Sequence, residues 1–358
     1  MTHATYRTPI VPAREIAKTL ALVVAFVAWA LIEFFAVPAH SAGESFELLN
    51  VSYDPTRELY KDINEKFTAQ YKQETGNDLV IKQSHGGSSA QARAVTDGLQ
   101  ADVLTLAMWP DTQAVSKAGL ISSGWESRLP DNSVPYTSTI IFLVRKGNPK
   151  NIKDWSDLAK PGVEIITPNP KTSGNGKLSL FAIWGSVIKR GGTEAEALDL
   201  AAKIYSQAPV LDTGARGSTT TFVQKKIGDV LLTWENEAHL ALEESKGAVE
   251  FVYPPISILA DPPVTRVDTV ARRKGTTEIA DKYLNFLYSD EGQEIAAKHF
   301  YRPINQAVLA KHGASFPQIQ LFTVKDLSGG GWTDIFDTFF APGKIYDQVT
   351  AKALELEQ

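Results

Sequence analysis

The sequence predicts an α/β protein in which a parallel or mixed sheet is covered by helices on both faces. Strand-like and helix-like runs alternate along most of the chain. Serine- and glycine-rich turns recur where a strand pattern gives way to a helix pattern. The chain has 358 residues, of which 43% are hydrophobic, and this is enough for two packed lobes. Successive strand and helix units of this kind favour a sheet with helices on both sides.

The N-terminal segment resembles a secretory signal peptide. Three basic residues precede an apolar run at 20–32, and small residues near 39 and 42 offer cleavage sites. The apolar character continues past Glu33 to residue 37, so an uncleaved membrane anchor is the alternative. The charge of Glu33 weakens a permanent span. We therefore expect residues 1–42 to be a signal peptide, cleaved near 39 or 42.

The first series of strand and helix units follows this segment. A strand-like run at 46–53 is stopped by Asp54-Pro55 and leads into a helical stretch from Arg57 to about Glu74. The strand-like runs at 79–83 and 101–106 each lead into a turn and a further helix.

A second series begins after a proline-bearing link at 129–136, which is a candidate lobe boundary. Its strand-like runs lie at 138–144, 163–167 and 229–234, and it ends near Pro262-Pro263. The run at 264–270 is a candidate return strand, followed by helix-rich sequence and a C-terminal tail. We therefore expect lobe I to contain residues 43–136 and 268–358, and lobe II to contain residues 137–267.

Three serine- and glycine-rich turns, at 84–89, 171–176 and 214–220, are the candidate ligand-binding elements. Such turns expose backbone N–H groups at the positive end of a helix dipole, which suits a small anion. An ordinary capped helix start explains a single turn equally well. Neither of the first two turns fits the phosphate-loop or dinucleotide glycine pattern. Taken together, the three turns predict an oxyanion-binding site.

Composition and side-chain spacing argue against catalysis and against metal binding. The net charge of -5 gives no bulk attraction for nucleic acid or an anionic membrane, and the absence of cysteine excludes disulfides and thiolate chemistry. The six histidines are scattered, and Glu235 and Glu237 lack support as a glycosidase pair. We expect no catalytic residue, no metal and no cofactor. A secreted hydrolase would need a nucleophile and base that we do not find.

Several long stretches resemble the periplasmic sulfate-binding protein family, and they occur in the family's order between residues 46 and 348. The matching stretches are 48–60, 83–88, 166–174, 214–219, 228–238 and 291–303.

The resemblance implies a two-lobed periplasmic-binding-protein fold, in which each lobe is a mixed sheet flanked by helices. It implies a monomeric periplasmic protein that closes on sulfate in the interlobe cleft and delivers it to the permease subunits of an ABC-type importer. The implied donors are the backbone N–H groups of Asp54, Gly174, Asn175 and Ala215, the hydroxyls of Ser88 and Ser173, and the indole N–H of Trp234.

Two positions depart from the family pattern, and one arginine has an expected role outside the contact set. Asn175 stands where the family usually has glycine, and asparagine tolerates left-handed backbone geometry better than most residues. Trp109-Pro110 is unusual at the expected cleft rim. We expect Arg216 to support its loop rather than to touch the ligand.

A lining made only of donors suits sulfate, which is a dianion without a proton at neutral pH. Phosphate usually keeps a proton at this pH and would leave it without an acceptor. Thiosulfate shares the charge and shape of sulfate, so thiosulfate or another tetrahedral oxyanion is the alternative ligand.

Overall fold

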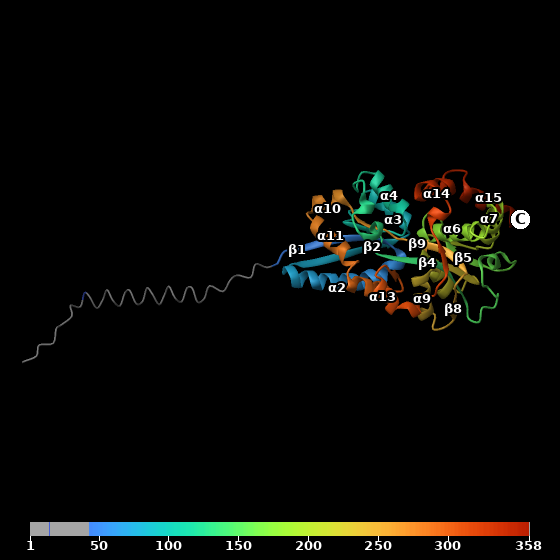
Figure 1. Ribbon diagram of the computed structural model, residues 1–358, viewed down its shortest axis with the longest axis horizontal. Helices are drawn as coiled ribbons and strands as arrows, with labels where there is room; N and C mark the ends of the chain where they lie inside the picture. Colours follow the sequence, from blue (N-terminus) through green and yellow to red (C-terminus); the bar gives the residue numbers. More distant parts are fainter. Residues whose placement is uncertain (1–13, 15–42, 358) are drawn as a thin grey trace, which may run out of the picture. The chain divides into compact units, whose positions relative to one another are not determined.

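Two sheets flanked by helices make up the fold of the computed structural model, which describes residue 14 and residues 43–357 (Figure 1). The expected signal peptide therefore lies outside the described residues, apart from Arg14. Within the described part of the chain, no helix combines the length and the apolar character needed to cross a bilayer.

The first sheet has the strand order β10-β3-β1-β2. β1 (Ser45–Tyr53) pairs in parallel with β2 (Asp78–Gly86) and with β3 (Val103–Thr105). β10 (Val264–Arg266) pairs antiparallel with β3, so the sheet is mixed and the expected return strand joins it as the edge.

Helices cover both faces of this first sheet. Leu48 and Val51 are three positions apart on β1 and so point to opposite faces, each into a separate hydrophobic cluster. The cluster around Leu48 includes Phe67 and Tyr283, and the cluster around Val51 includes Trp125. The flanking helices are α2 (Arg57–Thr75), α3 (Ser88–Thr96), α4 (Trp109–Lys117), α10 (Asp268–Lys274), α11 (Thr277–Phe286) and α12 (Asp290–Lys298).

The second sheet is built around β4 (Tyr136–Arg145), whose central residues Ile140 to Leu143 are fully buried. The strand order is β12-β9-β4-β7-β5-β6, and β8 and β11 also pair with β4. The other strands are β5 (Ile165–Pro168), β6 (Leu211–Asp212), β7 (Val230–Trp234), β8 (Val249–Val252), β9 (Ile256–Ala260), β11 (Arg302–Pro303) and β12 (Gln320–Phe322).

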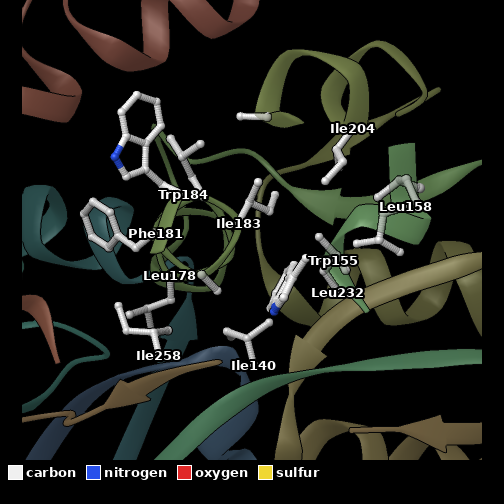
Figure 2. Close-up of a cluster of buried hydrophobic side chains, with 14 of the residues drawn as sticks. Ile140, Trp155, Leu158, Leu178, Phe181, Ile183, Trp184, Ile204, Leu232 and Ile258 are labelled. Atoms are coloured by element: carbon white, nitrogen blue, oxygen red, sulfur yellow. The ribbon is translucent and has the colours of Figure 1, made fainter. Parts of the chain in front are cut away.

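The largest hydrophobic cluster packs helix α6 (Gly174–Ile188) against this second sheet (Figure 2). Trp155 is fully buried, and its indole N–H donates to the Ile256 carbonyl at 2.7 Å. Its ring meets Phe142 of β4 edge-on, with centroids 4.7 Å apart. This dense packing fixes the N-terminal end of α6 relative to the strands.

The C-terminal region is helical, and it packs on the second sheet's helices. α14 (Gly331–Phe340) and α15 (Ile345–Leu356) lie beside α6 and α7 (Glu194–Ser206) (Figure 1). Phe339 of α14 contacts the rings of Phe181 and Trp184 in α6. The expected division into lobes, with residues 268–358 in lobe I, stays a prediction.

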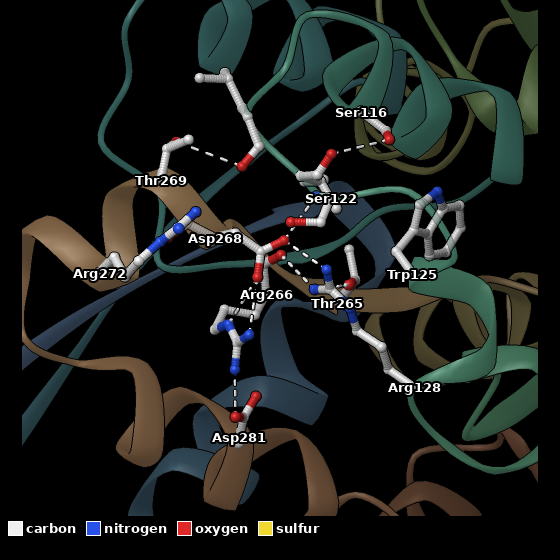
Figure 3. Close-up of polar contacts among 12 residues, drawn as sticks. Ser116, Ser122, Trp125, Arg128, Thr265, Arg266, Asp268, Thr269, Arg272 and Asp281 are labelled. Atoms are coloured by element: carbon white, nitrogen blue, oxygen red, sulfur yellow. Dashed lines mark hydrogen bonds and ion pairs between the residues drawn. The ribbon is translucent and has the colours of Figure 1, made fainter.

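A polar network ties β10 to the loop that follows α4 (Figure 3). Asp268 accepts hydrogen bonds from the Ser122 backbone N–H at 2.7 Å, from Arg128 at 2.5 Å and from Arg266 at 2.8 Å. Burial acts to raise the pKa of Asp268, but these hydrogen bonds outweigh burial and lower the pKa to about 2.

The remaining short elements connect the two sheets and their helices. They are η1 (Asp54–Thr56), η2 (Trp125–Ser127), α5 (Pro130–Ser133), η3 (Trp155–Ala159), α8 (Ala215–Thr219), η4 (Thr220–Gln224), α9 (Glu235–Glu244), α13 (Gln306–Lys311), η5 (Gly313–Ser315) and η6 (Val324–Asp326).

Candidate anion-binding site

The seven predicted site residues all lie at the N-terminal ends of helical segments, and all are buried. Such ends carry backbone N–H groups without an intrahelical acceptor. Asp54 begins η1, Ser88 begins α3, Gly174 and Asn175 begin α6, Ala215 begins α8, Ser173 is the N-cap of α6, and Trp234 is the N-cap of α9.

One set of contacts joins Ser88 to the start of α6. The backbone N–H of Ala107 donates to Ser88 Oγ at 3.1 Å. Gly174 packs so closely on Ala107 that a Cβ at Gly174 would stand 2.6 Å from the Cβ of Ala107. The structure therefore brings the N-termini of α3 and α6 together, although they belong to helices on different sheets.

A second set of contacts joins Asp54, Ala215 and Trp234 to the same region. The carboxylate of Asp54 lies against Gly214, the residue before Ala215, and Gly214 also approaches the backbone nitrogen of Gly87. The ring of Tyr53 packs on Trp234, with centroids 5.2 Å apart. The segments that carry all seven residues thus meet where the two sheets adjoin.

Trp234 carries an unpaired donor at this meeting point. Its side chain is 0% exposed, and its Nε1 has no hydrogen-bond partner among the described residues. A buried donor without an acceptor costs about 1 to 3 kcal/mol. An anion accepting from this N–H would remove that cost.

The hydroxyl of Ser88 has a different partner from the expected one. It donates to Asp111 Oδ2 at 2.6 Å, and the hydroxyl of Ser89 donates to Asp111 Oδ1 at 2.7 Å. A hydroxyl has a single hydrogen, so Ser88 Oγ has none left for an anion in this structure. The backbone N–H of Ser88, at the first position of α3, is the donor that remains.

The second position of α6 has ordinary helical backbone geometry. Asn175 lies inside the helix and is absent from the positive-φ residues. Its Oδ1 accepts from the Ser179 hydroxyl at 3.0 Å, and its Nδ2 is buried without a partner in the described chain. Asparagine at this position therefore adds a second unpaired buried donor to the predicted site residues.

Arg216 forms ion pairs that lie beside the donors. Its Nη2 lies 2.9 Å from Glu58 of α2, and its Nε lies 2.8 Å from Glu237 of α9. Burial raises the pKa of Glu237, and Arg216 acts in the opposite direction. Arg216 is therefore occupied by two carboxylates.

His85, in the first of the three turns, is neutral at pH 7, because burial and the charge of Arg57 lower its pKa to about 4.

The sequence did not predict that three carboxylates would lie in this region, namely those of Asp111, Glu58 and Glu237. Glu58 is 158 residues from Arg216, and no local pattern signals the pair. The described residues contain no group of three or more His, Cys, Asp or Glu side chains placed to hold a metal ion.

Comparisons with known proteins show which family the chain resembles. Residues 49–302 match the family model described as bacterial extracellular solute-binding protein. The chain is 51% identical over 327 residues to the sulfate-binding protein of Escherichia coli K12, covering 90% of this chain and 99% of the relative. It is 49% identical to the thiosulfate-binding protein of Pseudomonas aeruginosa, covering 84% of this chain and 91% of the relative.

A solved structure shares the fold. The sulfate-binding protein SubI of Mycobacterium tuberculosis H37Rv superimposes with a TM-score of 0.75 at 31% identity, covering 82% of this chain and 99% of SubI. The two-lobed α/β fold and the resemblance stated from the sequence are both confirmed. The chain therefore belongs to the bacterial extracellular solute-binding protein family, together with these sulfate- and thiosulfate-binding relatives.

Proposed function

We propose that this protein binds sulfate where the helix N-termini of its two lobes meet, and delivers it to an ABC-type importer without catalysing a reaction. The observation that carries the proposal is the buried, unpaired indole N–H of Trp234 beside these N-termini. The names of the relatives at 51% and 49% identity support the same ligand class.

The donors suit a fully deprotonated dianion. Backbone N–H groups at Asp54, Gly174, Asn175 and Ala215 each stand at a helix start, where the dipole favours negative charge. Hydrogen bonds to charged groups contribute about 1.5 to 3 kcal/mol each, so several together offset the desolvation of the ion. The Ser173 hydroxyl and the backbone N–H of Ser88 complete the proposed set.

Lobe closure is the proposed conformational step. Because donors come from helices on both sheets, the ligand contacts both lobes only when they are together and so shifts the population toward that form. We propose that α14 and α15 move with the second lobe, since Phe339 packs on α6. The permease subunits would then recognise the closed, monomeric protein.

The proposed location is the periplasm, reached through a signal peptide at residues 1–42. Fractionation of cells that produce the full chain should recover a shortened protein in the periplasmic fraction. N-terminal sequencing that begins near residue 40 or residue 43 would support cleavage, and an intact N-terminus in the membrane fraction would contradict it.

Calorimetric titration of the sulfate-free protein tests the ligand. We expect one site for sulfate and no heat with phosphate at neutral pH. Thiosulfate is the second candidate ligand because a thiosulfate-binding relative is nearly as similar as the sulfate-binding ones. Thiosulfate binding more tightly than sulfate would reverse their order, and silence with both ions would refute the proposal. Turnover of ester substrates would point instead to a hydrolase.

A further inference from the structure

A cavity of about 430 Å³ is lined by residues of α3, α4, α6 and α14. Its walls come from α3 and α4, which flank the first sheet, and from α14 and the start of α6, which flank the second. None of the seven predicted site residues lines it. The cavity is thus a separate space that both lobes build together.

Lys177 supplies a buried ammonium group to this cavity. Its side chain is 2% exposed although it carries a charge. Its Nζ donates to Ser89 Oγ at 2.5 Å and faces the rings of Phe340 and Phe336, with centroids 5.6 Å and 5.9 Å away. An ammonium has three N–H donors, and one hydrogen bond within the described chain accounts for only one of them.

The cavity carries an excess of positive charge. Arg93 and Lys171 line it together with Lys177, and Asp111 supplies its carboxylate. Asp111 already accepts from two hydroxyls, and Lys171 lies 3.3 Å from Asp347. Burial lowers the pKa of Lys177, Asp111 opposes this change, and Arg93 adds to it. A bound anion would relieve the repulsion between Arg93 and Lys177.

The remaining walls are apolar. Phe336 and Phe340 of α14 face Pro110 and Ala114 of α4 across the space. Small-molecule sites are clefts of roughly 300 to 1,000 Å³ with apolar walls and a few placed polar groups. We propose that this cavity binds a small organic carboxylate, with the carboxylate group on Lys177 and the apolar body between Phe336 and Phe340.

A chain of hydrogen bonds connects this cavity with the anion-binding site. Lys177 donates to Ser89, Ser89 donates to Asp111, and Asp111 also accepts from Ser88. Lys177 and Ser89 belong to helices on different sheets, so this bond forms only when the lobes are together. A carboxylate in the cavity therefore strengthens sulfate binding, and by linkage sulfate strengthens carboxylate binding by the same factor. This coupling, unlike the cavity itself, rests on the proposed function.

Ligand-observed NMR with benzoate as the probe tests the cavity. We expect saturation transfer from the protein to benzoate but not to benzamide, its neutral analogue. One sample contains saturating sulfate, which keeps benzoate out of the anion-binding site. A second sample contains no sulfate.

Two variants and a matched control locate the binding. Lys177→Met removes the charge, and Ala114→Trp fills the cavity from an exposed position of α4 while keeping Lys177. Each should weaken benzoate binding by about tenfold or more, since a charged hydrogen bond or the space itself is lost. Lys189→Met is the matched control and should leave benzoate binding unchanged. Lys189 lies at the C-terminal end of the same helix and is paired with Asp326.

Other outcomes would overturn the proposal. The first is an absence of saturation transfer to benzoate in the unmodified protein, and the second is equal transfer to benzamide. The third is unweakened benzoate binding by Ala114→Trp, and this variant decides the question if Lys177→Met does not fold. Equal benzoate affinity with and without sulfate would refute the coupling alone. If calorimetry shows no sulfate binding, the proposed function fails, and the benzoate result still decides the cavity.

Discussion

The backbone of Gly87 lies so close to Thr172 that a Cβ on Gly87 would stand 2.5 Å from the Thr172 carbonyl oxygen. The same Cβ would stand 2.8 Å from the carbonyl oxygen of Thr213. Gly87 precedes α3 on the first sheet's side, whereas both threonines precede helices of the second. A side chain at residue 87 is therefore excluded by the other lobe and not by its own.

Gly87→Ala should weaken sulfate binding while leaving the fold intact. The φ of Gly87 is -61°, which alanine adopts freely, so the added methyl group obstructs only lobe closure. We expect about tenfold or more loss of affinity by calorimetry, which corresponds to about 1.4 kcal/mol, with little change in Tm. Gly86→Ala is the matched control, because its Cβ would make ordinary contacts at 3.6 Å with Gln91. Equal affinity for the two variants would contradict the closure argument.

Trp234→Phe should reduce sulfate affinity without lowering stability. The indole N–H has no acceptor in the described chain, so its removal leaves no protein group unpaired. One hydrogen bond to a charged group is worth about 1.5 to 3 kcal/mol, so affinity should fall roughly tenfold to a hundredfold. Trp155→Phe provides the reverse case, since it leaves the Ile256 carbonyl without its donor. Trp155→Phe should lower Tm and keep sulfate affinity; a stability loss in Trp234→Phe instead would argue for a structural role.

Asn175→Asp should change ligand affinity and stability in opposite directions. A carboxylate in the first turn of α6 is favoured by the helix dipole, by about 0.3 to 1 kcal/mol, and it repels an anion bound at the same end. We expect a small gain in the Tm of the ligand-free protein and at least about tenfold weaker sulfate binding. Ser179→Ala removes the hydrogen bond to Asn175 Oδ1 without adding charge and should leave affinity near normal. Unchanged affinity in Asn175→Asp would place this side chain away from the ligand.

Arg216→Met should be costly to stability because it strands a buried carboxylate. Glu237 is fully buried and relies on Arg216, whereas the Glu58 side chain is 39% exposed. Losing the partner of a buried charge costs about 3 to 5 kcal/mol, and an exposed ion pair is worth about 1 kcal/mol or less. Urea unfolding should therefore show a large loss for Arg216→Met and a small one for Glu58→Gln. Adding Glu237→Gln to Arg216→Met should recover part of the loss; no recovery would mean that the stranded charge is not the cause.

Acid should remove a stabilising contribution from Asp268 at low pH. Its pKa in the folded protein is lowered to about 2, below the ordinary value of 3.8. The folded state therefore binds this proton less readily than the unfolded state, and the contribution is present above about pH 4 and lost as pH falls toward 2. Unfolding free energies measured across this range should fall less steeply for Asp268→Asn, and parallel curves would refute the assignment.

Much of the fold is readable from local sequence, because strand and helix periodicity are local properties. The strand at 45–53 and the helix at 57–75 were predicted within one residue at each end. The strand ending at Gly86 was predicted to stop at residue 83, since the serine and glycine content of its last turn suggests a loop. The C-terminal tail is helical, although no helix was predicted there.

The sequence predicts the site only as far as it predicts where helices begin. Serine- and glycine-rich turns indicate where exposed N–H groups lie, and they identified all the candidate segments except those of Asp54 and Trp234. Asp111, which takes the hydrogen of Ser88, lies 23 residues away, and tertiary packing alone brings the two together. The hydrogen-bond partners of a residue therefore decide which of its donors is free to bind a ligand, and the sequence of a turn does not reveal these partners.

The edge strand β10 completes the first sheet only after most of the chain has been made. Thr265 pairs with Leu104, so 160 residues, most of them from the second series, must be synthesised between these two paired positions. A nascent chain that has reached residue 260 holds three strands of this sheet with β3 unpaired along one side. Closing so long a loop is slow, and the N-terminal lobe therefore stays loosely folded until most of the polypeptide has emerged. Such a delay would suit the export proposed above, because a loosely folded chain can pass through a narrow secretion channel.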